Sequence, residues 1–129
     1  MSALYRTALS TTILLVLGCG SSSVRRPVQG PEPAASAFET VPNAPPEPHV
    51  DLVRAAPSKD AVWVDGQWER VDGAWRWAEG AWARPPPGAK FSPARLRRDK
   101  EGAIRFAAAH WVDVSGRALE VTTVRAEAP

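Results

Sequence analysis

The chain has 129 residues and a formal net charge of +2, so it is long enough for one small domain with appendages. A charge this small, with no basic run interleaved with aromatic residues, argues against nucleic-acid binding. The lone cysteine, Cys19, excludes an internal disulfide.

The N-terminal residues have the pattern of an export signal. Arg6 supplies a positive charge, and an apolar run, ALSTTILLVL, follows from Ala8 to Leu17. This run is too short to span a bilayer as a helix, but it has about the length of a signal-peptide core. We therefore predict a helical signal peptide over residues 1–18.

The quartet that closes this segment, Val16-Leu17-Gly18-Cys19, resembles the lipobox of bacterial lipoproteins. The resemblance implies cleavage between Gly18 and Cys19 and acylation of Cys19. Each buried methylene contributes about 0.8 kcal/mol to membrane binding, so several acyl chains anchor a protein stably. The alternative is an ordinary signal peptide, or an uncleaved anchor, with a chance cysteine. Gly20 in place of Asp after the cysteine favours the outer membrane.

Residues 19–59 are predicted to be a disordered linker. After Cys19 the segment scatters Ser, Pro, Ala and Glu without an apolar period, and eight of the 13 prolines lie between Pro27 and Pro57. Such a composition does not bury enough apolar surface to offset the entropy lost on ordering. As polyproline II, about 40 residues would hold a domain up to ~100 Å from the membrane. His49 lies in this segment, where a lone histidine is not expected to bind a metal.

Residues 60–125 are predicted to form a small all-β domain, with 126–129 as a C-terminal tail. Apolar residues alternate with polar ones, and Asp-Gly or Glu-Gly breaks recur at Asp65-Gly66, Asp72-Gly73 and Glu79-Gly80. Asp-Gly between alternating segments is a strong hairpin signal. We expect an antiparallel meander with strands near 61–64, 67–71, 74–78 and 81–84. With the C-terminal half, the meander is expected to close into a sandwich or open barrel.

Turns at all three breaks would place the largest side chains on one face, because the side-chain period of a strand is two. This strip, a candidate core or binding surface, consists of Trp63, Trp68, Arg70, Trp75, Trp77 and Trp82. Four of the tryptophans would form one row across four strands, with Arg70 and Trp75 beside it. Strand parity requires that tight turns alternate with wider ones, so the predicted structural repeat has 14 residues rather than seven.

The 14-residue unit recurs along the chain. Trp63-x-x-Gly66-x-Trp68 is repeated as Trp77-x-x-Gly80-x-Trp82, and degenerate copies begin at Phe91 and Phe106. Pro85-Pro86-Pro87-Gly88 is expected to turn a corner, and further hairpin loops are expected at Arg98–Gly102 and at Ser115-Gly116.

These tandem units resemble the WXXGXW (or YXWGXW) repeat proteins of bacterial envelopes, over roughly residues 61–111. The resemblance implies a short exported or lipid-anchored envelope protein. It brings no established catalytic residues.

Two functions stay open for the tryptophan strip. A buried strip would be the core of a structural or protein-interaction module, since cross-strand aromatic pairs stabilise small sheets. An exposed strip could stack on the sugar rings of peptidoglycan or another envelope glycan, or bind an envelope protein.

Catalysis is not expected. His110, Asp65, Asp72 and Ser115 are not arranged as a nucleophile and base, and the sequence has no phosphate-binding loop and no His/Cys cluster. We therefore expect no catalytic residue, no cofactor and no metal. The expected partners are the membrane, through Cys19, and an envelope glycan or protein.

Overall fold

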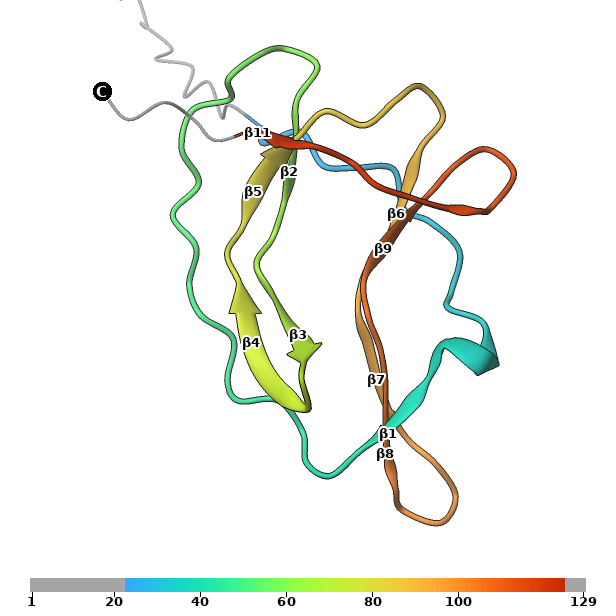
Figure 1. The fold of residues 1–129 in the computed structure, drawn as a ribbon. Coiled ribbons are helices and arrows are strands. Elements are labelled where there is room, and N and C mark those ends of the chain that lie inside the picture. Colours follow the sequence, from blue (N-terminus) through green and yellow to red (C-terminus); the bar gives the residue numbers. More distant parts are fainter. Residues whose placement is uncertain (1–22, 125–129) are drawn as a thin grey trace, which may run out of the picture.

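The structure, a computed structural model, describes residues 23–124, which form several small antiparallel sheets (Figure 1). The predicted signal peptide, its cleavage site at Gly18 and Cys19, and the tail 126–129 lie outside the described residues. Within 23–124 the sheets do not close into a barrel, and the one helical element is the 3-10 turn η1 (Ala35–Ala37). No helix in this range is long and apolar enough to cross a membrane.

The four strands predicted around the tryptophans are confirmed, but of their three predicted pairings only that of residues 67–71 with residues 74–78 is confirmed. The strands are β2 (Val62–Val64), β3 (Gln67–Val71), β4 (Ala74–Ala78) and β5 (Ala81–Ala83). β3 pairs with β4, and β2 pairs with β5, both antiparallel. Together they form one long hairpin, the first hairpin, in which each arm is interrupted once (Figure 1). The predicted four-stranded meander is therefore wrong.

Strand parity explains this arrangement. Asp72-Gly73 turns the chain, with φ angles of 50° and 77° that suit a tight two-residue hairpin turn. Asp65-Gly66 and Glu79-Gly80 do not turn. They lie opposite each other in one continuous register, between the pairs Val64↔Ala81 and Gln67↔Ala78. The conflict between successive tight turns is avoided because only the middle break is a turn.

The degenerate repeat copies form a second hairpin on the same plan. Its strands are β6 (Lys90–Ser92), β7 (Arg95–Arg98), β8 (Ile104–Ala107) and β9 (His110–Val112), with β7 paired to β8 and β6 to β9. The pairs Phe91↔Trp111 and Leu96↔Phe106 stand where Trp63↔Trp82 and Trp68↔Trp77 stand in the first hairpin. The predicted loop at Arg98–Gly102 is confirmed, and the 14-residue unit corresponds to one arm of a hairpin.

The described part of the predicted linker is built into the fold. β1 (Glu39–Val41) pairs with β8, and Val41 is buried. The amide of Trp63 donates to the carbonyl of Arg25 at 2.8 Å, and the amide of Phe91 donates to that of Val28 at 2.8 Å. The prediction of a disordered linker is therefore wrong for residues 23–59, because long-range strand pairing supplies the order that local composition does not.

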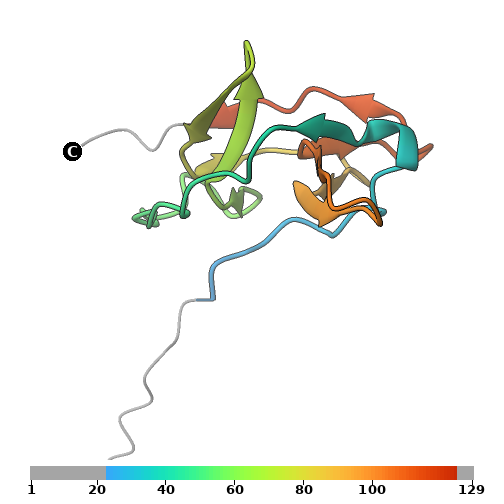
Figure 2. The ribbon, with the colours of Figure 1, turned by 90° about the horizontal axis from the view of Figure 1, so that it is seen from below.

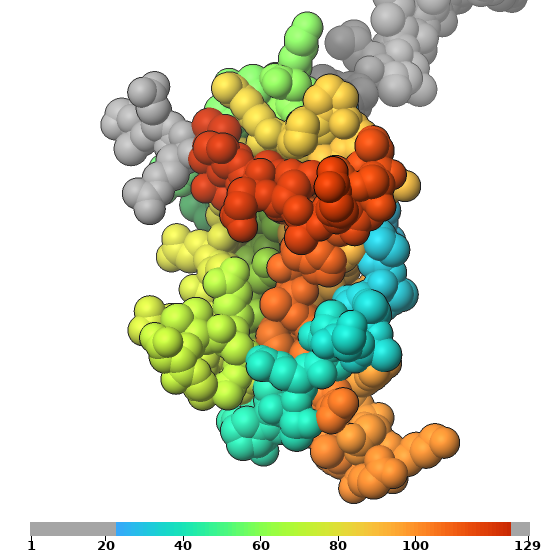
Figure 3. All heavy atoms as spheres, turned by 45° about the vertical axis from the view of Figure 1, so that its right-hand side comes forward, coloured from blue at the N-terminus to red at the C-terminus, as the bar shows by residue number. Residues whose placement is uncertain are grey.

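The C-terminal segment ties the two hairpins together. β10 (Ala118–Leu119) pairs with β9, and β11 (Thr123–Val124) pairs with β5. Figure 3 shows this segment, in red, crossing over the molecule. The hairpin predicted at Ser115-Gly116 is confirmed, although its second arm pairs only over Ala118–Leu119. The corner predicted at Pro85–Gly88 is also present, where the Ala89 amide donates to the Pro86 carbonyl at 3.1 Å.

Asp113 holds the turn between β9 and β10. Its carboxylate accepts hydrogen bonds from the Ser115 hydroxyl at 2.6 Å and from the amides of Ser115 and Arg117. These bonds, first of all that of the Ser115 hydroxyl, lower the pKa of Asp113 below its ordinary value of 3.8. A carboxyl group whose pKa is lower in the folded state stabilises the fold at pH values above its unfolded-state pKa. This stabilisation is lost as the pH falls through the folded-state pKa.

The substitution Asp113→Asn should therefore destabilise the protein at neutral pH, and the loss of stability should become smaller at acidic pH. We expect the difference in urea midpoint between the two proteins to narrow between about pH 6 and about pH 3. Urea titrations across this range check it. A difference that stays constant with pH would contradict this role of the carboxylate.

Candidate functional site

Two pairs of tryptophan rings pack edge to face across the first hairpin. Trp63 and Trp82 have ring centroids 5.5 Å apart at an interplanar angle of 68°, and Trp68 and Trp77 are 5.3 Å apart at 70°. Such pairs contribute about 0.5–1.5 kcal/mol beyond the area they bury. The single row predicted across four strands is wrong, because the two pairs lie on either side of the interruption of one hairpin.

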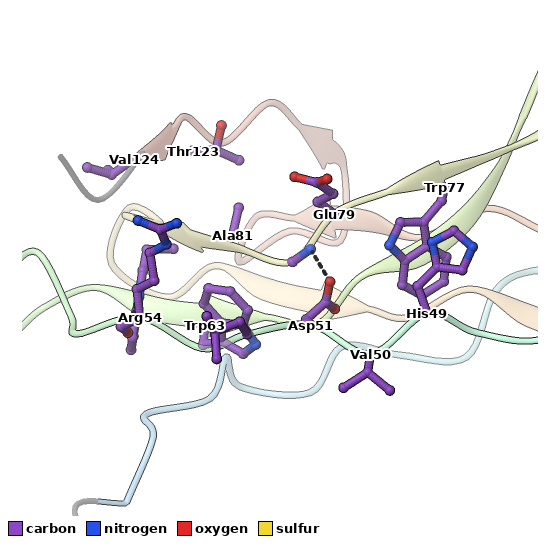
Figure 4. Close-up of a pocket in the computed structure, with 13 residues that line it drawn as sticks. His49, Val50, Asp51, Arg54, Trp63, Trp77, Glu79, Ala81, Thr123 and Val124 are labelled. Atoms are coloured by element: carbon purple, nitrogen blue, oxygen red, sulfur yellow. Dashed lines mark hydrogen bonds between the residues drawn. The ribbon is translucent and has the colours of Figure 1, made fainter. Parts of the chain in front are cut away.

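The side chain of Asp51 occupies the interruption between the two pairs. The amide of Gly66 donates to Asp51 Oδ2 at 2.6 Å, and the amide of Gly80 donates to Asp51 Oδ1 at 3.2 Å. Figure 4 shows the second of these bonds, with Trp63 on one side of Asp51 and Trp77 on the other. One carboxylate, the Asp51 bridge, thus satisfies two amides that the strand ladder leaves unpaired.

Each glycine of the repeat lies under a tryptophan of the other repeat. A Cβ atom on Gly66 would stand 2.5 Å from Cζ2 of Trp77, and a Cβ on Gly80 would stand 2.5 Å from Cζ2 of Trp63. Both would also approach the carboxylate of Asp51 to within 3 Å, at 2.5 Å and 2.9 Å. The spacing Trp-x-x-Gly-x-Trp therefore encodes reciprocal packing of two units around a local twofold axis.

Gly66→Ala and Gly80→Ala should each destabilise the protein by about 2 kcal/mol, because overpacking a well-filled site typically costs 1–3 kcal/mol. Urea unfolding followed by tryptophan emission measures this effect. Gly102→Ala is the control for adding a methyl group, since its Cβ meets nothing within 4 Å, although its φ of 87° brings a strain of its own. A smaller loss at Gly66 and Gly80 than at Gly102 would contradict the packing argument.

The segment from His49 to Arg54 covers the tryptophan pairs. The ring of His49 lies 4.8 Å from that of Trp77 and 5.3 Å from that of Trp68, and the indole N–H of Trp82 donates to the carbonyl of Arg54 at 3.1 Å. Sequence reasoning expected no role for His49 and overlooked Asp51. The sequence does hold one indication of a shared role. His49 and Asp51 are two residues apart, and residues two apart in an extended chain point to the same side.

Arg70 and Trp75, predicted to face each other beside the row, are paired across β3 and β4, and Trp75 contacts the second hairpin. The guanidinium of Arg70 lies 4.9 Å from the centre of the Trp75 ring. Trp75 in turn packs edge to face on Phe106 of the second hairpin, with centroids 4.9 Å apart at 86°. The indole N–H groups of Trp68 and Trp75 are buried and have no acceptor among the described residues.

The predicted strip is mainly internal. Trp63 and Trp82 are each 4% exposed and form a buried hydrophobic cluster with Ala61, while Trp68, Trp75 and Trp77 are half-buried. A groove of about 790 Å³ lies beside Asp51, and its walls include Arg54, Trp63, Trp77 and Glu79 (Figure 4). The strip is therefore neither a flat exposed surface nor a fully enclosed core.

The polar residues considered for catalysis lie apart from this groove or serve local structure. Asp65 accepts the indole N–H of Trp63 at 3.0 Å and forms an ion pair with Arg26, Asp72 lies in the hairpin turn, and His110 Nδ1 lies 3.2 Å from the Ala108 carbonyl. No group of three His, Cys, Asp or Glu within 23–124 is placed to hold a metal. Comparisons with protein-family models, curated proteins and solved structures return no match to this chain.

Proposed function

We propose that this protein is a lipid-anchored component of the bacterial cell envelope, held in the outer membrane by acyl chains on Cys19. Its repeat domain is a non-catalytic structural or protein-interaction module. The observation that carries this proposal is the reciprocal packing of Trp63 on Gly80 and Trp77 on Gly66, closed by Asp51. A small domain without disulfides is short of core, so large aromatic residues that interlock in this way supply stability rather than chemistry.

The anchor is supported by the lipobox-like quartet and by the absence of any other cysteine in the chain. Replacement of Cys19 with Ala should abolish labelling by radioactive palmitate and release the protein from the membrane fraction. Ser23→Ala, a small-residue change close to Cys19, should leave both unchanged. A Cys19→Ala protein that still incorporates palmitate and still sediments with membranes would refute the anchor.

A second function, binding of peptidoglycan or another envelope glycan, is favoured by the groove beside Asp51. Its walls combine the half-buried ring of Trp77 with the charged residues Arg54 and Glu79. Sugar rings stack on aromatic faces, and their hydroxyl and carboxyl groups need such polar partners.

Sedimentation with purified peptidoglycan tests this second function. Arg54→Ala is the informative variant, because only the backbone carbonyl of Arg54 takes part in a described hydrogen bond within the fold. Arg76→Ala, an exposed change on β4 outside the groove, is the matched control. Glycan binding requires that the parent protein sediments with peptidoglycan and that Arg54→Ala, but not Arg76→Ala, weakens it. Any other result would contradict glycan binding in this groove.

A further inference from the structure

The folded body begins close to Cys19. Val24 packs against the core cluster, Arg25 accepts the amide of Trp63, and Arg26 pairs with Asp65. Six residue steps separate Cys19 from Arg25, which span at most roughly 20 Å even when fully extended. A lipid on Cys19 would therefore hold the body at the membrane surface, and the reach of ~100 Å expected of a disordered linker is not available.

The two hairpins share one plan but differ in charge. Residues 62–83 of the first hairpin hold two Arg and four Asp or Glu, a net charge of −2. Residues 90–112 of the second, here called the basic hairpin, hold six Lys or Arg and two Asp or Glu, a net charge of +4 with His neutral. Since the folding pattern is the same, the fold itself does not require this excess of cations.

Two arginines of the basic hairpin oppose each other without an acidic partner. Arg97 and Arg105 are directly paired across β7 and β8, an arrangement in which like charges are destabilising. Arg97 lies over the Phe38 ring at 3.7 Å, and Arg105 donates to the Thr40 hydroxyl at 2.7 Å. Arg95 of β7 forms an ion pair with Glu32 at 2.9 Å, but within residues 23–124 neither Arg97 nor Arg105 forms a salt bridge, so these two cations are held by neutral groups.

The N-terminal segment and the basic hairpin lie on the same side of the molecule. Figure 2 shows the blue segment and the orange strands β7 and β8 together on one side, while the β3–β4 turn points to the other. Hydrogen bonds between Phe91 and both Val28 and Gly30 fix the segment along β6. A membrane that holds the chain at Cys19 would therefore face the basic hairpin.

We propose that the basic hairpin docks on the anionic phospholipid headgroups of the membrane that carries the protein. This docking rests on the proposed anchor, because the anchor sets which side faces the membrane. The short connection from Cys19 to Arg25 and the positive charge of the basic hairpin support it. Phosphate groups would neutralise the opposed arginines Arg97 and Arg105. Each basic residue close to an anionic bilayer contributes about 1 kcal/mol, which is about fivefold in affinity.

The test uses the chain from residue 19 to residue 129 with Cys19→Ser, which carries no lipid and retains every described element. We expect it to co-sediment with vesicles that contain phosphatidylglycerol and not with pure phosphatidylcholine vesicles, and to dissociate as salt rises. Arg97→Glu/Arg98→Glu should weaken binding at least about tenfold. Lys90→Glu/Lys100→Glu should weaken it similarly, and neither lysine takes part in a described side-chain contact, so loss of folding is not an explanation.

The matched control is Arg54→Glu/Arg76→Glu, which changes the net charge by the same amount outside the basic hairpin, at two exposed residues whose side chains take part in no described hydrogen bond or ion pair. Equal weakening by this control would show that net charge alone drives binding, and would overturn the proposal. Equal binding to both kinds of vesicle would also overturn it. Because the test protein lacks the acyl group, its outcome is independent of palmitate labelling at Cys19, and the two proposals can fail separately.

Discussion

A chain that begins at Asp60 is expected to remain unfolded in water, although it contains the whole predicted repeat domain. It lacks β1, which is the third strand of the β1-β8-β7 sheet, and it lacks the buried side chain of Val41. It also lacks Asp51 and the carbonyl of Arg54, which pair with groups around the tryptophans. A domain of this size has only a few kcal/mol of stability to lose.

Near-ultraviolet circular dichroism and the wavelength of tryptophan emission measure this loss. The chain from residue 60 should show red-shifted emission and no cooperative urea transition, whereas a chain from residue 23 should unfold like the parent protein. Addition of a separate peptide spanning 23–59 to the truncated chain should restore blue-shifted emission. A cooperative transition at the parent midpoint without that peptide would show that residues 23–59 are dispensable.

The substitution Asp51→Ala should cost about 3 kcal/mol of unfolding free energy. It leaves the amides of Gly66 and Gly80 without their shared acceptor, and a hydrogen bond to a charged group contributes about 1.5–3 kcal/mol. The strands do not provide substitute acceptors, since the two glycines lie in the unpaired interruption of the hairpin. Water can reach the half-buried site in part, which keeps the expected cost below the sum of two such bonds.

Urea unfolding of three variants separates the bridge from a general effect of the segment. Asp51→Asn keeps one carbonyl oxygen as an acceptor and should cost about half as much as Asp51→Ala. Glu47→Ala removes an exposed carboxylate four residues earlier and should change the stability by less than about 0.5 kcal/mol. Similar losses for Asp51→Ala and Glu47→Ala would mean that Asp51 does not bridge the glycines.

The strands were predictable from the sequence because the patterns that specify them are local. Alternating residues and the Asp72-Gly73 turn place β2 to β5 within one residue of their observed ends. Pairing depends on which of three similar breaks turns the chain, and Asp65-Gly66 has the same two residues as Asp72-Gly73. Parity shows that the three breaks cannot all be alike, but it does not identify the one that turns. The two breaks that do not turn are bonded by Asp51, which lies outside the repeat.

The segment before residue 60 was not predictable from composition. Its prolines and small residues offer little apolar surface, and β1 is ordered by pairing with β8, about 65 residues away in the chain. For the same reason, the sequence does not predict whether the tryptophan strip is buried or exposed. The residues that cover it, His49, Asp51 and Arg54, lie in the part of the sequence that carries no strand pattern of its own.

The close fit of each glycine under a tryptophan has a consequence for how such repeats change during evolution. In the second hairpin, Phe91 and Phe106 stand at the first-tryptophan positions, and Ala94 and Ala109 stand at the glycine positions. A smaller ring leaves room for a methyl group, so ring and glycine are expected to be exchanged together, as compensating substitutions. Duplicated units would thus inherit matched pairs. Trp77→Phe should remove the part of the cost of Gly66→Ala that comes from the ring, while the close approach to the Asp51 carboxylate remains.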